Sequence, residues 1–174
     1  MSVSLNLTDL MEYTDWERRK RYELLRQQGD RVLEFSVGPH GDGRFESVGD
    51  MIRHIFSAEK RYVERLSGRP LTDVASIPKD SIEALFGFGQ QSRKELRELL
   101  AQGVEWDAPQ DFKILDYQIK VTPKKIVTHI LMHEIRHWAQ IATLLRLNGV
   151  VGDFHDFLFS PAMGGEFSRE RANA

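Results

Sequence analysis

The chain has no cysteine among its 174 residues. That absence excludes disulfides, thiolate metal ligands and a cysteine nucleophile, and it is compatible with a reducing compartment. No apolar run is long enough to span a membrane, and the first residues lack the basic and apolar parts of a secretory signal. The formal net charge of −2 gives no field that would gather nucleic acid. We therefore expect a cytoplasmic protein that binds neither nucleic acid nor membranes.

Composition and apolar spacing indicate the fold class. Hydrophobic residues make up 41% and charged residues 29% of the chain, as in ordinary globular proteins. This length suits one domain, so we expect residues 1–174 to form a single unit. Apolar residues recur at helical spacing in four segments, at about 7–28, 47–68, 80–102 and 122–149. The sequence thus predicts an all-α four-helix bundle.

Local signals mark the ends of these helices. Asn6 or Thr8 can cap the first helix, and Ser47 with Asp50 has the Ser-x-x-Asp form of a capping box before the second. Thr122 can cap the fourth helix, which has proline at its first position and an Asn-Gly pair at its end. Each signal acts on the neighbouring backbone, so the boundaries follow from short stretches of sequence.

Three stretches depart from a simple amphipathic helix. Gly87 and Gly89 weaken the third helix, each by about 1 kcal/mol relative to alanine, and are compatible with a kink or break. Residues 16–21 in the first helix are heavily charged, so we expect them to be solvated. In the connection at 104–121, apolar and polar residues alternate in two short runs, which allows a small β-hairpin. We expect this connection to carry little chemistry.

His129, His133 and His137 recur every four residues in the fourth helix. Residues at this spacing share a helix face with Cβ atoms about 5–6 Å apart, so two imidazoles can bind one metal ion. His129 and His137 lie about 12 Å apart along the axis, so all three cannot bind the same ion. The spacing predicts one adjacent pair plus a ligand from another helix, without saying which pair. His54, near the apolar stripe of the second helix, is a candidate for that ligand.

Two other interpretations of these histidines stay open. His133-Glu134-Ile-Arg-His137 has the His-Glu-x-x-His pattern of zinc proteases, in which the glutamate activates a water. A third ligand is needed there, and the downstream candidates, His155 and Glu166, lie in no convincing helical pattern. The protease interpretation is therefore weak. Alternatively, the histidines are ordinary helix residues, because short motifs also match by chance.

Three stretches resemble the DinB-like superfamily, which includes the bacillithiol and mycothiol transferases. They are Met51-Ile-Arg-His54-Ile-Phe-Ser-Ala-Glu59, the helix from His129 to Gly149, and Asp156-Phe-Leu-Phe159. The resemblance implies a four-helix bundle of the DinB/YfiT type with a long crossover. This chain differs in having tryptophan after the last histidine of the helix, where many relatives have arginine, and in its Ser-Pro-Ala-Met-Gly-Gly run near the end.

The resemblance also implies a metal site. It assigns His54, His133 and His137 as ligands of zinc or nickel, with an open coordination position. His129 is then expected beside the ligands or in the core. Gln140 can hold a ligand or a bound water, or equally pack at the edge of the bundle.

Two acidic residues near these histidines receive separate expectations. Glu134 points about 100° away from the preceding histidine on the helix, so it need not face the metal. Glu59 can form a salt bridge with a basic neighbour, although solvent exposure is the simpler expectation.

The implied activity is metal-dependent transfer of a low-molecular-weight thiol to a small-molecule substrate. A divalent cation lowers the pKa of a bound thiol, and without cysteine the thiol must come from a cofactor or substrate. Two alternatives are a hydrolase that uses a metal-bound water and a noncatalytic, stress-related binder of metal or small ligands. Because relatives often pair, homodimer formation is a further hypothesis.

Overall fold

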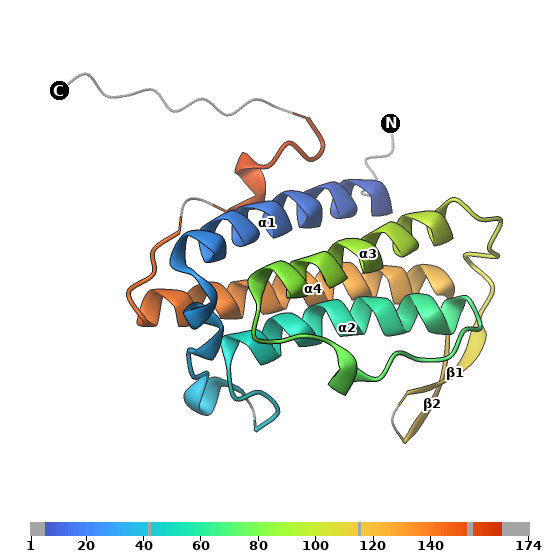
Figure 1. The fold of residues 1–174 in the computed structure, drawn as a ribbon. Helices are drawn as coiled ribbons and strands as arrows, with labels where there is room; N and C mark the ends of the chain where they lie inside the picture. The colour runs from blue at the N-terminus through green and yellow to red at the C-terminus, as the bar shows by residue number, and fades with distance from the viewer. Residues whose placement is uncertain (1–5, 42, 115, 153–154, 165–174) are drawn as a thin grey trace.

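The structure is a computed structural model that describes residues 6–41, 43–114, 116–152 and 155–164. Four long helices run through the molecule: α1 (Leu7–Gln28), α2 (Val48–Leu66), α3 (Ile82–Leu100) and α4 (Pro123–Leu147) (Figure 1). Short 3₁₀ turns lie in the connections at Asp30–Glu34, Gly38–Gly41, Val74–Ser76 and Phe157–Phe159. None of the helices in this described part is long and apolar enough to cross a membrane.

The four helices form the bundle that the sequence predicts. α2 packs along both α3 and α4, and α1 packs along α4 and, less extensively, α3. His54 of α2 meets His133 of α4, whereas Tyr62, further along α2, meets the earlier His129. α2 and α4 therefore run antiparallel, and residues about 80 positions apart in the chain lie face to face.

The helix ends lie where the local signals place them. Asn6 and Asp9 form a reciprocal capping box at the start of α1. Ser47 accepts a hydrogen bond from the Asp50 amide at the start of α2. Thr122 caps α4 in the same way, by accepting from the Lys125 amide. Such caps satisfy amides that have no partner within the helix, which explains why they fix the boundaries.

The long connection between α3 and α4 contains the hairpin. β1 (Gln110–Ile114) pairs antiparallel with β2 (Tyr117–Val121), with Phe112 opposite Ile119. Figure 1 shows this hairpin projecting beside one end of α2 and α4.

α3 is one continuous helix through both of its glycines, so no break occurs there. A Cβ atom at Gly89 would lie only 2.9 Å from atoms of the Phe56 ring, whereas a Cβ at Gly87 would meet nothing within 4 Å. Gly89 therefore permits close approach of α2 and α3, because a side chain there would collide with the ring. The cost of glycine in the helix is offset by this packing.

The charged middle of α1 is largely buried, contrary to the expectation of a solvated surface. Glu17, Arg18 and Arg21 are all buried, although Arg19 between them is exposed. Glu17 accepts a hydrogen bond from Arg21, one helical turn away, at 3.1 Å. The expectation failed because a charged side chain can enter a core when an opposite charge meets it there.

Arg18 belongs to a buried ion-pair network that joins all four helices. It pairs with Glu59 of α2 at 3.0 Å and, through two nitrogens, with Glu134 of α4. Arg93 of α3 pairs with the same two carboxylates, at 2.9 Å to Glu59 and 2.6 Å to Glu134. Glu59 and Glu134 are each 1% exposed. The expected exposure of Glu59 is thus wrong, because two arginines from other helices compensate its charge.

The segment after α4 packs partly on the bundle. The Phe157 ring lies edge-on to Tyr13 of α1, with ring centroids 5.0 Å apart, whereas Leu158 is 80% exposed. Tyr13 donates a hydrogen bond to the backbone carbonyl of His155.

Candidate metal centre

Three histidine side chains from two helices converge between α2 and α4. The Nε2 atom of His133 lies 2.9 Å from Nε2 of His54 and 3.1 Å from Nε2 of His137. One nitrogen from each ring lies within 4.8 Å of the other two. The structure thus brings together a pair at i and i+4 on α4 and one histidine from α2, the arrangement that the spacing requires.

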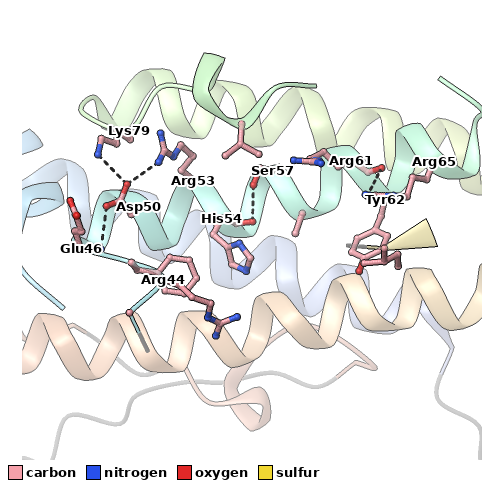
Figure 2. Close-up of a pocket in the computed structure, with 15 residues that line it drawn as sticks. Arg44, Glu46, Asp50, Arg53, His54, Ser57, Arg61, Tyr62, Arg65 and Lys79 are labelled. Carbon is pink, nitrogen blue, oxygen red and sulfur yellow. Dashed lines mark hydrogen bonds and ion pairs between the residues drawn. The ribbon is translucent and has the colours of Figure 1, made fainter. Parts of the chain in front are cut away.

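Local packing orients these rings. His137 is 1% exposed, whereas His54 and His133 are partly buried. Phe45, in the connection before α2, packs on His54 with ring centroids 4.9 Å apart and edge-on to His137 at 5.9 Å. Figure 2 shows His54 on the side of α2 that faces α4. Phe45 therefore closes one side of the cluster with an apolar wall.

A hydrogen bond to Gln140 determines which nitrogen of His137 is available as a ligand. The Nδ1 atom of His137 lies 2.6 Å from Oε1 of Gln140, one turn further along α4. An amide oxygen only accepts, so Nδ1 carries the proton and Nε2 presents its lone pair to the other histidines. Metal-binding histidines commonly have such a partner on the second nitrogen.

Burial and neighbouring cations favour the neutral form of the histidines. Burial lowers the pKa of His54 to about 4, and His137 and the nearby arginines contribute to the shift. Burial also lowers the pKa of His133 to about 2, again with help from the adjacent histidines. Because only the neutral imidazole has a free lone pair, both shifts leave these rings ready to bind a cation near neutral pH.

The donor set fits a transition-metal ion. Two nitrogens bound to one tetrahedral zinc ion at 2.0–2.1 Å are about 3.3 Å apart, close to the spacings in this cluster. Imidazole suits zinc, copper, iron and nickel better than magnesium or calcium. Three protein ligands would leave coordination positions for water or substrate, as in catalytic sites. The three histidines can therefore hold a metal ion and leave part of it accessible.

His129 lies beside this cluster but does not converge with it. Its ring packs on His133 and edge-on to Tyr62, with centroids 5.6 and 5.5 Å apart. The side chain is exposed, and the group of possible ligands does not include it. Its contacts suit support of the neighbouring rings rather than metal binding.

Glu134 does not take the position of a protease general base. Its carboxylate is buried in the ion-pair network, and it also accepts a hydrogen bond from the Trp138 indole at 2.9 Å. Burial alone would raise the pKa of Glu134, but Arg18 and Arg93 outweigh that effect and hold the pKa below its ordinary value. Trp138 likewise has a structural role here, as the donor to this carboxylate.

Of the two downstream ligand candidates for a zinc protease, the one that the structure describes is not in the cluster. His155 lies against Glu17 on α1, with 3.6 Å between Nδ1 and Oε1. Glu166 lies outside the described residues. The residues of the His-Glu-x-x-His pattern therefore do not form one site. The two histidines lie on one face of α4 in the cluster, whereas the glutamate lies in the core of the bundle.

Two basic clefts lead to the histidines. One, of about 610 Å³, runs along α2 past His54 (Figure 2). Ile114 of the hairpin also lines it, and its basic residues are Arg44, Arg53, Arg61, Arg65 and Lys79. The other, of about 700 Å³, lies along α4; it is lined by Lys124, Lys125, Arg136 and both His129 and His133. The connection at 104–121 thus contributes a wall to a cleft, although it was expected to carry little chemistry.

The chain matches a known family over nearly its whole length. The model described as the DinB family covers residues 1–167. The chain belongs to the DinB family. No match to this chain is found among the curated proteins. The resemblance noted from the three sequence stretches is confirmed, and this DinB protein has a three-histidine group that can hold a metal ion.

Sequence reasoning missed several residues around the site of this DinB protein. Phe45 and Arg44 lie in an irregular connection, where no periodic pattern points to them. The sequence pattern could have pointed to Arg61 and Arg65, because they lie seven and eleven positions after His54 and therefore on a similar face of α2. Charges on a helix are usually solvated, however, and only the cleft distinguishes these two.

Proposed function

We propose that this protein is a metal-dependent transferase that joins a low-molecular-weight thiol to a small electrophile. The observation that carries the proposal is the convergence of three imidazole nitrogens beside two open clefts. Family membership supports metal binding, and the bacillithiol and mycothiol transferases of the same superfamily supply the reaction class. Zinc or nickel is the proposed metal, because both suit imidazole ligands.

His54, His133 and His137 would hold the ion, which when bound would supply the positive charge that favours a thiolate over a thiol. The protein's own residues have simpler tasks. Gln140 fixes the tautomer of His137, and Phe45 covers the ring edges and limits access of water from its side. The clefts admit the two reactants.

The overall reaction balances without an oxidant or reductant. The sulfur of the thiol forms a bond to carbon of the electrophile, and the leaving group departs with its bonding electrons. The proton of the thiol is released to solvent or to that leaving group. No cysteine is needed in the chain, in keeping with its composition.

Metal binding is tested first, by elemental analysis of protein purified without a metal-chelating tag. We expect about one metal ion per chain, and loss of that ion in His54→Ala and His137→Ala with the fold retained by circular dichroism. His155→Ala is the matched control, because it removes an imidazole that lies against Glu17 of α1 and outside the cluster. Equal metal content in all three variants would contradict the assignment.

The reaction is tested with the metal-loaded protein, an aryl halide and each of three thiols: bacillithiol, mycothiol and glutathione. We expect thioether formation with at least one thiol, and its loss in His133→Ala. Turnover of ester or amide substrates without any thiol would favour the hydrolase instead. Ligand-induced thermal stabilisation without turnover of any substrate would favour the noncatalytic binder.

A further inference from the structure

The cleft along α2 contains two kinds of basic residue. Arg53 and Lys79 both contact Asp50, at 3.0 and 3.2 Å, so a carboxylate of the protein already meets their charges. Arg61 and Arg65 lie further along the helix in the same cleft. Within the described part of the chain, neither has an acidic side chain at ion-pair distance.

The contacts of Arg65 hold its side chain in place without neutralising its charge. Arg65 lies over the Tyr62 ring, 5.5 Å from its centroid, and donates a long hydrogen bond to the Arg61 carbonyl. Burial lowers the pKa of Arg65, with a further contribution from the charge of Arg61. Both arginines are only partly exposed. Two like charges on successive turns of a helix repel each other, and an anion between them would remove that cost.

The distance from the histidines to these arginines sets the size of the ligand. Arg61 is seven residues after His54 and Arg65 is eleven after it, about 10 and 16 Å along the helix axis. Side chains shorten or lengthen these spans by a few ångströms. An extended chain of three residues spans about 10 Å. A tripeptide-sized molecule can therefore reach from the metal site to the first arginine.

We propose that Arg61 and Arg65 bind a carboxylate of the small molecule whose sulfur is placed at the three histidines. This inference rests on the proposed function, since it names the class of thiol that the site takes. The planar guanidinium group matches a carboxylate through two parallel hydrogen bonds, which gives it more directional specificity than a lysine. The clefts then select thiols that carry carboxylates, such as bacillithiol and glutathione, over the uncharged mycothiol.

The test uses cobalt-loaded protein, in which sulfur ligation produces a charge-transfer absorption that measures thiol binding directly. Glutathione and glutathione diethyl ester form the matched ligand pair, because they share the sulfur and differ in their carboxylates. Arg61→Gln/Arg65→Gln is compared with Arg31→Gln/Lys94→Gln, which removes the same charge from exposed sites outside both clefts. Metal content is measured for every variant.

We expect wild-type protein and the control to bind glutathione about 10- to 100-fold more tightly than the ester, the range for charged hydrogen bonds. The cleft variant should bind both ligands alike and keep its metal. Added salt should reduce the preference of the wild-type protein, because salt screens exposed charges.

Two results would overturn parts of this scheme separately. Equal binding of glutathione and its ester by wild-type protein would refute the carboxylate site while leaving thiol ligation intact. Absence of the absorption band with either thiol would refute thiol ligation itself. In that case calorimetry with S-methylglutathione decides: binding that requires Arg61 and Arg65 supports the carboxylate site, and no binding overturns it.

Discussion

Replacement of Glu134 by glutamine distinguishes a structural carboxylate from a catalytic one. Glu134 is 1% exposed, and its two oxygens meet Arg18, Arg93 and the Trp138 indole. The amide of glutamine removes the negative charge, which leaves Arg18 paired with Glu59 alone and Arg93 with Glu59 and the partly exposed Asp15. Breaking a buried ion pair from one side costs about 3–5 kcal/mol, because it leaves an uncompensated charge in the core.

This cost should be visible in unfolding experiments. A protein of this size loses about 2–4 °C of melting temperature per kcal/mol, so Glu134→Gln should melt roughly 6–20 °C below wild type. Urea unfolding followed by circular dichroism gives the free energy of unfolding directly. Metal content should stay at the wild-type level, because Glu134 faces away from the histidines.

Glu59→Gln provides the matched comparison. Glu59 occupies the same network on α2 and pairs with the same two arginines, but it lies outside any protease motif. We expect the two variants to lose similar stability, within the twofold to threefold spread of such values. If Glu134→Gln unfolds like wild type and Glu59→Gln loses several kcal/mol, the network does not carry the stability assigned to Glu134. A selective loss of hydrolytic turnover in stable Glu134→Gln would restore the protease interpretation.

Three further predictions concern packing, the histidine tautomer and pH. Gly89→Ala should cost about 1–3 kcal/mol in urea unfolding, because its Cβ would strike an aromatic ring, whereas Gly87→Ala should be neutral or gain up to about 1 kcal/mol. Equal values would refute the close-packing argument. Gln140→Leu should weaken metal affinity about 10- to 100-fold in a chelator competition, and unchanged affinity would show that its hydrogen bond to the histidine is dispensable. Because the pKa of His54 is lowered from 6.5 to about 4, the unfolded state takes up its proton first as the pH falls. The metal-free protein should therefore lose stability from about pH 6.5 to 4, and His54→Gln should show a smaller loss in thermal melts across this window.

The helical framework could be predicted from the sequence because its determinants are local. A cap such as Asn6 or Thr122 satisfies amides two or three residues away, and apolar periodicity requires only that one face of a helix be buried. The hairpin in the long connection followed from alternation over a few residues. The spacing of the histidines on α4 also predicted that one adjacent pair would bind a metal ion together with a ligand from another helix. Only the resemblance to relatives selected His133 and His137 over the pair with His129.

Tertiary packing decided the features that join distant parts of the chain. The sequence contains no local sign that Arg18, Glu59, Arg93 and Glu134 meet in the core, since each alone is more stable in water. They are buried only because four helices bring opposite charges together at once. The antiparallel pairing of α2 with α4 likewise places His54 against the histidine pair, and the connections that pack along α2 form the cleft that Arg61 lines. Local sequence determined where the helices begin and end, because short-range hydrogen bonds fix those ends, whereas their mutual packing determined which charges and rings could meet.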